Sequence, residues 1–196
     1  MELRQSLNFL ANNLRCEFRS LRPEDVSPHY IKGLRNDSPY ILGVPDRVTV
    51  ESQQAYINQI LSSRDDSING LFVNGKLIGT SGTQLSADFV KFHDGSFGKL
   101  NNVGIFIFDL SFRGVGFGKT LVWAATYCLH ASNNTYWFAA GMKRDNTPSL
   151  MSFLSCGYKQ IRNEEESVRV MLNFAELKAP KFVTDISLNP YDAAVK

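Results

Sequence analysis

The sequence predicts a mixed α/β fold in which a sheet of about seven strands is flanked by about four helices. Three observations indicate this class. Short apolar or alternating segments recur along the chain, with amphipathic segments between them. In the first half, Asn74-Gly75 separates two strand-like runs and is a strong β-hairpin signal. In the second half, the β-prone run 101–110 leads through a glycine-rich turn into a helical run at 118–131.

Local signals place the elements of the first half. Pro23 suits the first turn of a helix, which we expect to continue to about Leu34. Thr49 is a plausible N-cap of a second helix, because its side chain can accept a backbone N–H hydrogen bond. Strands are expected over residues 16–21, 67–73 and 76–85.

The second half begins with a polar segment, 86–99, which predicts a long loop before the strand 101–110. Thr147-Pro148 indicates the start of a short helix that ends at Gly157, a plausible C′ residue. Residues 175–196 have weak periodicity and are expected to form an extension of unknown shape. Further strands are expected over residues 136–140, 158–161 and 168–174.

Composition narrows the classes of function. The 196 residues suit a single domain, 1–196, with its core in 16–174. A net charge of +2 without a basic stripe argues against nucleic-acid binding. No apolar run approaches the ~20 residues of a membrane span, so no membrane association is expected. The three cysteines lack metal-site spacing and fit a reducing, cytoplasmic location without a bound metal.

The turn Arg113-Gly114-Val115-Gly116-Phe117-Gly118-Lys119 is the strongest candidate for chemistry. It joins a strand to a helix, and a helix N-terminus presents unpaired N–H groups and a partial positive charge. Glycines let several N–H groups converge on one anion, so a pyrophosphate is a natural ligand. A tight turn without a ligand is the other interpretation of the same residues. Lys119 lacks the GxxxxG frame of a Walker loop, and the dinucleotide fingerprint is incomplete.

Two blocks of the sequence together resemble the GCN5-related N-acetyltransferase family. The first is Arg113, Gly116 and Gly118, which match the pattern Arg/Gln-x-x-Gly-x-Gly/Ala. The second runs from Asn146 to Tyr158 and has the family's asparagine, small residue, aromatic residue and closing Gly-aromatic pair. The resemblance covers residues 16–174 and implies an N-acetyltransferase domain with acetyl-CoA as cosubstrate.

The resemblance also assigns roles. An amine acceptor would attack the thioester directly, and the backbone N–H near Phe108 would polarise its carbonyl. The pantetheine arm would lie in a gap where the strand 101–110 splays from the next strand at a bulge. Asn146 would hydrogen-bond this arm. The cofactor-binding residues implied are Phe108, Asp109, Leu110, Arg113, Gly114, Val115, Gly116, Phe117, Gly118, Lys119, Asn146 and Phe153.

The acid and the base depart from the family's pattern. Phe153 occupies the position of the tyrosine that usually protonates the leaving thiolate, so Ser152, Ser155, Cys156 or water would have to act instead. The strand carries no glutamate at 100–104. His93 is a candidate base with a suitable pKa, although a solvated loop residue is the favoured interpretation.

The acceptor would lie against the first two helices. The stretch with Tyr30, Leu34 and Asn36 and the stretch with Tyr56 look like the branch of ribosomal-protein and amino-sugar acetyltransferases. This branch implies a small-molecule or peptide amine, such as a nucleotide-linked amino sugar or a protein N-terminus, acted on by a monomer or homodimer. The same tyrosines and leucine could instead be core residues. A catalytically weak acyl-CoA-binding module and a dinucleotide oxidoreductase are the alternative functions.

Overall fold

The computed structural model describes residue 3 and residues 5–36, 48–86, 90–92 and 95–191. Within them, nine strands form one sheet, in which every neighbouring pair is antiparallel except β7 and β8. The strands lie in the order β11 (Val183–Pro190), β1 (Gln5–Ala11), β2 (Leu14–Ser20), β3 (Asp66–Val73), β4 (Lys76–Leu85), β7 (Leu100–Ile107), β8 (Trp137–Lys143), β10 (Ser167–Asn173) and β9 (Lys159–Asn163).

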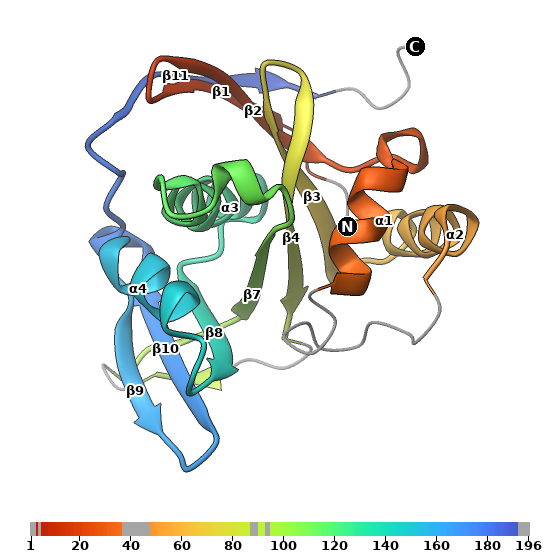
Figure 1. Cartoon of the computed structure of the whole chain (residues 1–196). Helices are drawn as coiled ribbons and strands as arrows, with labels where there is room; N and C mark the ends of the chain where they lie inside the picture. The colour runs from red at the N-terminus through yellow and green to blue at the C-terminus, as the bar shows by residue number, and fades with distance from the viewer. Residues whose placement is uncertain (1–2, 4, 37–47, 87–89, 93–94, 192–196) are drawn as a thin grey trace.

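Helices cover both faces of this sheet (Figure 1). On one side lie α1 (Pro28–Asn36) and α2 (Val50–Leu61), and on the other lie α3 (Phe117–Asn133) and α4 (Thr147–Ser155). The predicted mixed α/β class, with about four helices, is therefore confirmed for the described residues. A dinucleotide-binding fold is excluded, because that fold needs a mostly parallel sheet.

Most local signals in the sequence were accurate, but the helix expected from Pro23 to about Leu34 is divided. Pro23–Asp25 form a short 3-10 helix, and α1 begins only at Pro28, because a proline disfavours a helical conformation of the residue before it. Thr49 caps α2, and its side chain accepts a hydrogen bond from the Ser52 N–H at 3.1 Å. Asn74 and Gly75 both take positive φ, 48° and 79°, as a tight two-residue hairpin turn between β3 and β4 requires. The start of α4 is one residue earlier than expected, because its N-cap is Asn146.

Both ends of the chain add strands that the sequence did not predict. β1 precedes residue 16 and β11 follows residue 174, and these two strands pair with each other. β11 is an exposed edge strand with few apolar side chains, so its pattern gives little signal. The polar segment 86–99 also contains two short strands, β5 (Val90–Lys91) and β6 (Phe97–Gly98).

Two hydrophobic clusters lie on opposite faces of the sheet. The larger one packs α3 and α4 against the sheet, and the smaller one packs α1 and α2 against it. Tyr30 and Leu34 belong to the smaller cluster and are buried, so the core interpretation of these two residues is correct. Tyr56 is 47% exposed and remains available on the surface of α2.

Candidate functional site

The strands β7 and β8 separate along their length. They pair only at their first residues, where Leu100, Asn101 and Asn102 face Trp137, Phe138 and Ala139. β7 then continues to Ile107 and β8 to Lys143 without further pairing between them. Because α3 begins soon after β7 ends, the open end of this gap lies beside the helix N-terminus. The splayed strands expected from the sequence are therefore present.

A bulge ends β7. The N–H groups of Phe108 and Asp109 both donate to the carbonyl of Ile78 on β4, at 3.1 and 3.2 Å. Two residues thus oppose one, which defines a β-bulge. The expectation that the Phe108 N–H polarises the thioester is corrected by this geometry, because that N–H points toward β4 and already has an acceptor.

Register identifies the backbone groups that face the gap instead. Paired residues of an antiparallel ladder alternate between hydrogen-bonded and non-hydrogen-bonded pairs. Ser86 N–H donates to the Leu100 carbonyl and Phe108 N–H to the Ile78 carbonyl, so the even-numbered residues of β7 bond to β4. The backbone of Ile105 and Ile107 consequently faces the β8 side, beyond the last paired residue.

The glycine turn opens α3 as predicted. Gly114 and Gly116 have positive φ, 75° and 100°, and Gly116 is the N-cap. The first hydrogen bond of the helix runs from the Thr120 N–H to the Gly116 carbonyl at 3.1 Å. The N–H groups of the three residues before Thr120 precede this bond and are available to an external acceptor. The geometry is that of an anion site at a helix N-terminus.

The other residues predicted around this turn differ in exposure. The ring of Phe117 is buried and packs edge-on against Phe112, which anchors the start of α3 in the core. Val115 and Leu110 are exposed by 53% and 68%, so both can meet a ligand. The Arg113 Nε donates to the Ile107 carbonyl at 2.7 Å and ties the turn to the end of β7.

The predicted residues of α4 are engaged within the protein. Asn146 caps the helix, and its Oδ1 accepts from the Ser149 N–H at 3.3 Å. Phe153 is only 1% exposed and packs edge-on against the Tyr158 ring. The Ser152 hydroxyl donates to the Pro148 carbonyl at 2.8 Å, so it is a poor candidate for the acid. Asn146 retains its amide N–H groups for a ligand.

A charged cluster lies at the end of β7. Asp109 is buried and accepts hydrogen bonds from Lys76 Nζ at 2.7 Å and from both the N–H and the hydroxyl of Ser111. Burial alone would raise the pKa of Asp109, but these hydrogen bonds outweigh it and lower the pKa to about 2. His29 Nε2 lies 3.5 Å from the same carboxylate, and its ring packs against Phe108.

His29 is a candidate that the sequence did not reveal, because it looked like an ordinary helix residue. Its neighbours Phe108 and Asp109, just after β7, are about 80 positions away in the chain, so no local pattern could connect them. The other described histidine, His130, lies near the far end of α3 and stacks on Phe174. His93, the predicted base, lies outside the described residues.

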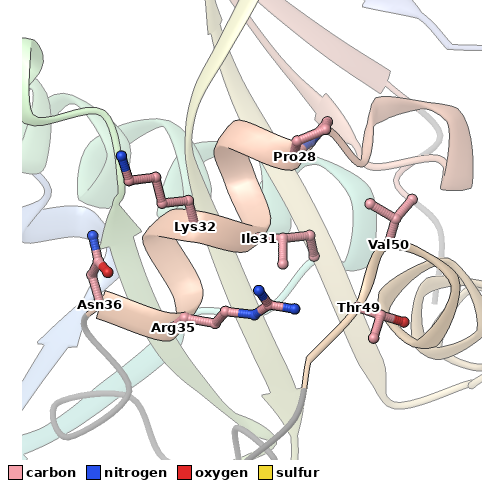
Figure 2. Close-up of a pocket in the computed structure, with 7 residues that line it drawn as sticks. All are labelled: Pro28, Ile31, Lys32, Arg35, Asn36, Thr49 and Val50. Atoms are coloured by element: carbon pink, nitrogen blue, oxygen red, sulfur yellow. The ribbon is translucent and has the colours of Figure 1, made fainter.

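The helix α1 closely approaches Phe108, the residue after β7. A Cβ atom at Gly33 would lie 2.5 Å from the Phe108 Cβ, so only glycine permits this approach. A pocket of about 430 Å³ lies between α1 and the start of α2. Figure 2 shows Ile31 and Arg35 directed toward α2, while Lys32 and Asn36 extend from the other side of α1.

The sheet itself is open at one point on the face that α1 covers. Gly82 of β4 and Gly104 of β7 are paired and exposed, and a Cβ atom at Gly82 would meet nothing within 4 Å. Two facing glycines leave a flat surface of backbone on which a second substrate can rest. Among the described residues, no helix is long and apolar enough to cross a membrane, and no group of three potential metal ligands occurs.

Solved structures share this architecture. RimJ of Mycobacterium smegmatis in complex with CoA-disulfide has a TM-score of 0.71 at 12% identity, over 89% of this chain and 90% of that one. Spermidine N-acetyltransferase from Vibrio cholerae in complex with CoA and spermine has 0.64 at 16% identity, over 82% and 96%. AAC(6')-Ib in complex with ribostamycin and coenzyme A has 0.65 at 14% identity, over 82% and 94%.

At these identities the likeness establishes the fold alone, which the chain shares with these acetyltransferases and with an acetyltransferase of the GNAT family from Streptococcus pneumoniae, at a TM-score of 0.57 and 15% identity, over 81% of this chain and 99% of that one. The nine-stranded sheet exceeds the expected seven strands, but the class is the one predicted from residues 113–118 and 146–158. No family model and no curated protein matches the sequence.

Proposed function

We propose that this chain is an N-acetyltransferase that transfers an acetyl group from acetyl-CoA to a primary amine in a ternary complex. One observation carries the proposal: the gap between β7 and β8 opens directly beside the glycine turn that begins α3. A pyrophosphate on the turn would thus place the pantetheine arm in the gap. Neighbours of the same fold bind CoA, which supports this ligand.

The chain's own groups suggest how the cofactor is held. The N–H groups at the start of α3 bind the pyrophosphate, and Asn146 donates its side-chain amide to the pantetheine arm. The backbone of Ile105 and the N–H of Ile107 face the gap and pair with the arm as a strand would, while the Ile107 carbonyl is held by Arg113. An N–H on this edge, rather than that of Phe108, polarises the thioester carbonyl.

The reaction is a direct acyl transfer. The amine nitrogen attacks the thioester carbonyl carbon, the C–S bond breaks, and coenzyme A leaves as a thiolate. The amine proton passes to a base, directly or through water. We propose His29 for this role, because it is half exposed beside Phe108 and contacts the ionised carboxylate of Asp109.

The acceptor is proposed to lie on the open sheet face beside α1. A nucleotide-linked amino sugar and a protein N-terminus are the two candidates that the resemblance suggests. The exposed glycine pair Gly82 and Gly104 offers room for either one. Lys32 and Arg35 add positive charge at the pocket between α1 and α2, where the Arg35 guanidinium also donates to the Val48 carbonyl. This charge favours an acceptor that carries a phosphate.

A second candidate function is an acyl-CoA-binding module with little catalysis. The observation that favours it is the burial of Phe153 against Tyr158, together with the engaged hydroxyl of Ser152. Neither group can protonate the leaving thiolate. Coenzyme A thiolate is nevertheless a tolerable leaving group, so this departure predicts slow turnover rather than none.

The test is a thiol-release assay with acetyl-CoA and a panel of amines, combined with mass spectrometry of the product. We expect release that depends on the amine and a product heavier by one acetyl group. Binding of coenzyme A by calorimetry without amine-dependent release would favour the binding module. Absence of both would refute the proposal.

A pair of glycine variants ties binding to the turn. Gly114→Val should weaken coenzyme A binding at least tenfold, because a side chain at positive φ distorts the turn. Gly95→Val introduces the same kind of strain at φ +83° in another open turn and should leave the affinity unchanged. Equal affinities for the two variants would contradict the assigned phosphate site.

A further inference from the structure

The segment after β10 passes the glycine turn on its way to the edge of the sheet. Lys178 N–H donates to the Cys156 carbonyl at 3.0 Å, which fixes the segment at the end of α4. From there the chain reaches β11, which pairs with β1. Figure 1 shows this connection running beside α3. Phe182 is the last residue of the connection before β11.

Phe182 rests directly on the N-cap of α3. A Cβ atom at Gly116 would lie 2.7 Å from the Phe182 Cζ, so the ring covers the glycine. Asn12, in the turn between β1 and β2, links the two segments. Its N–H donates to the Phe182 carbonyl at 3.3 Å, and its Nδ2 donates to the Val115 carbonyl at 3.1 Å.

The same ring lies beneath a cation. The Lys119 Nζ lies 4.9 Å from the centre of the Phe182 ring. An ammonium in the first turn of a helix is unfavourable, because it meets the positive end of the helix dipole. The contact with the aromatic face offsets part of this cost. When an anion occupies the helix N-terminus, it attracts both the Lys119 ammonium and the positive end of the helix dipole, so the repulsion between these two is offset.

We propose that Phe182 is a positioning residue for the phosphates of coenzyme A. It would hold the glycine turn in shape through Gly116 and hold the Lys119 ammonium beside the helix N-terminus. The segment after residue 174 is then part of the cofactor site, rather than an appendage to the fold. This inference rests on the proposed acetyl-CoA function.

The first experiment compares Phe182→Ala, Phe182→Tyr and Ile186→Ala. Ile186 lies in β11, four residues after Phe182, is 44% exposed, and serves as the control on the same segment of chain. Phe182→Ala should weaken coenzyme A binding about tenfold and raise the KM for acetyl-CoA similarly, with kcat at saturation unchanged. Phe182→Tyr should restore both values, since its ring keeps the aromatic face. Ile186→Ala should match the unmodified protein.

The second experiment tests the route through Lys119. Lys119→Met should also weaken coenzyme A binding, and the double variant with Phe182→Ala should lose less than the product of the two single losses. Pantetheine, which has no phosphate, should bind all variants equally. A loss of pantetheine binding, or a loss in Phe182→Ala that Phe182→Tyr does not restore, would overturn the inference.

Failure of the inference is distinguishable from failure of the proposed function. If the unmodified chain binds no coenzyme A, the proposed function fails. If it binds coenzyme A and Phe182→Ala binds it equally well, only the role of Phe182 fails. Melting temperatures of all variants identify any that lose affinity through unfolding.

Discussion

The contact between Gly116 and Phe182 predicts an energetic difference between two neighbouring glycines. Gly114 and Gly116 both take positive φ, but a Cβ atom at Gly114 would meet nothing within 4 Å, whereas one at Gly116 would meet the Phe182 ring. Gly114→Ala should therefore lower the free energy of unfolding only by the cost of a left-handed backbone at alanine, about 1–2 kcal/mol. Gly116→Ala should lower the free energy of unfolding by the same amount and by about 1–3 kcal/mol more, because the new methyl group must displace the Phe182 ring.

The assay is urea unfolding of the two variants, each made also in a Phe182→Ala background. In that background the space above Gly116 is open, so the two alanine substitutions should cost the same within about 0.5 kcal/mol. An equal cost of Gly114→Ala and Gly116→Ala in the unmodified protein would refute the contact. A difference that persists after removal of the ring would refute its assignment to Phe182.

Three further predictions concern charge and thiol chemistry. Asp109→Asn should lower stability by about 1–2 kcal/mol at pH 7. Because the folded pKa of Asp109 is depressed to about 2, this difference should fade as pH drops from near 4 through 2 in acid-unfolding curves. Lys32→Glu should raise the KM for a phosphate-bearing amine and leave that for acetyl-CoA unchanged in steady-state kinetics. Cys16, Cys128 and Cys156 are buried and their pKa values raised, so a thiol reagent at pH 8 should react only after unfolding.

Features with a short-range cause could be predicted from the sequence. Asn74-Gly75 specifies its hairpin because both residues tolerate positive φ, and Thr49 caps α2 through a bond to a residue three positions away. The glycine turn and the helix that follows it are likewise contiguous. Each of these devices acts within one turn of chain, so the residues themselves are sufficient to locate it.

Features with a long-range cause could not be predicted. β11 has mostly exposed side chains, and its place in the sheet comes from backbone pairing with β1, far away in the chain. The direction of the Phe108 N–H depends on the register of β7 against β4, which pairs Phe108 with Ile78, and the bulge turns the Asp109 N–H toward the same carbonyl. The contact of His29 with Asp109 requires α1 to approach Phe108, the residue after β7. Gly33 permits this approach, but a single glycine in a helix does not indicate its partner in the sequence.

The proposed site has more groups suited to holding acetyl-CoA than to accelerating its breakdown. The proposal places binding at three separate points: the turn at Gly116, the edge of β7 at Ile105, and the amide of Asn146. Departure of the thiolate has no comparable support, because Phe153 is buried and the hydroxyl of Ser152 is engaged. Catalysis would then depend chiefly on holding amine and thioester in line, which can itself supply several kcal/mol of the barrier. An enzyme of this kind should lose most of its rate when the geometry of the cofactor is disturbed, and little when single acids or bases near α4 are removed.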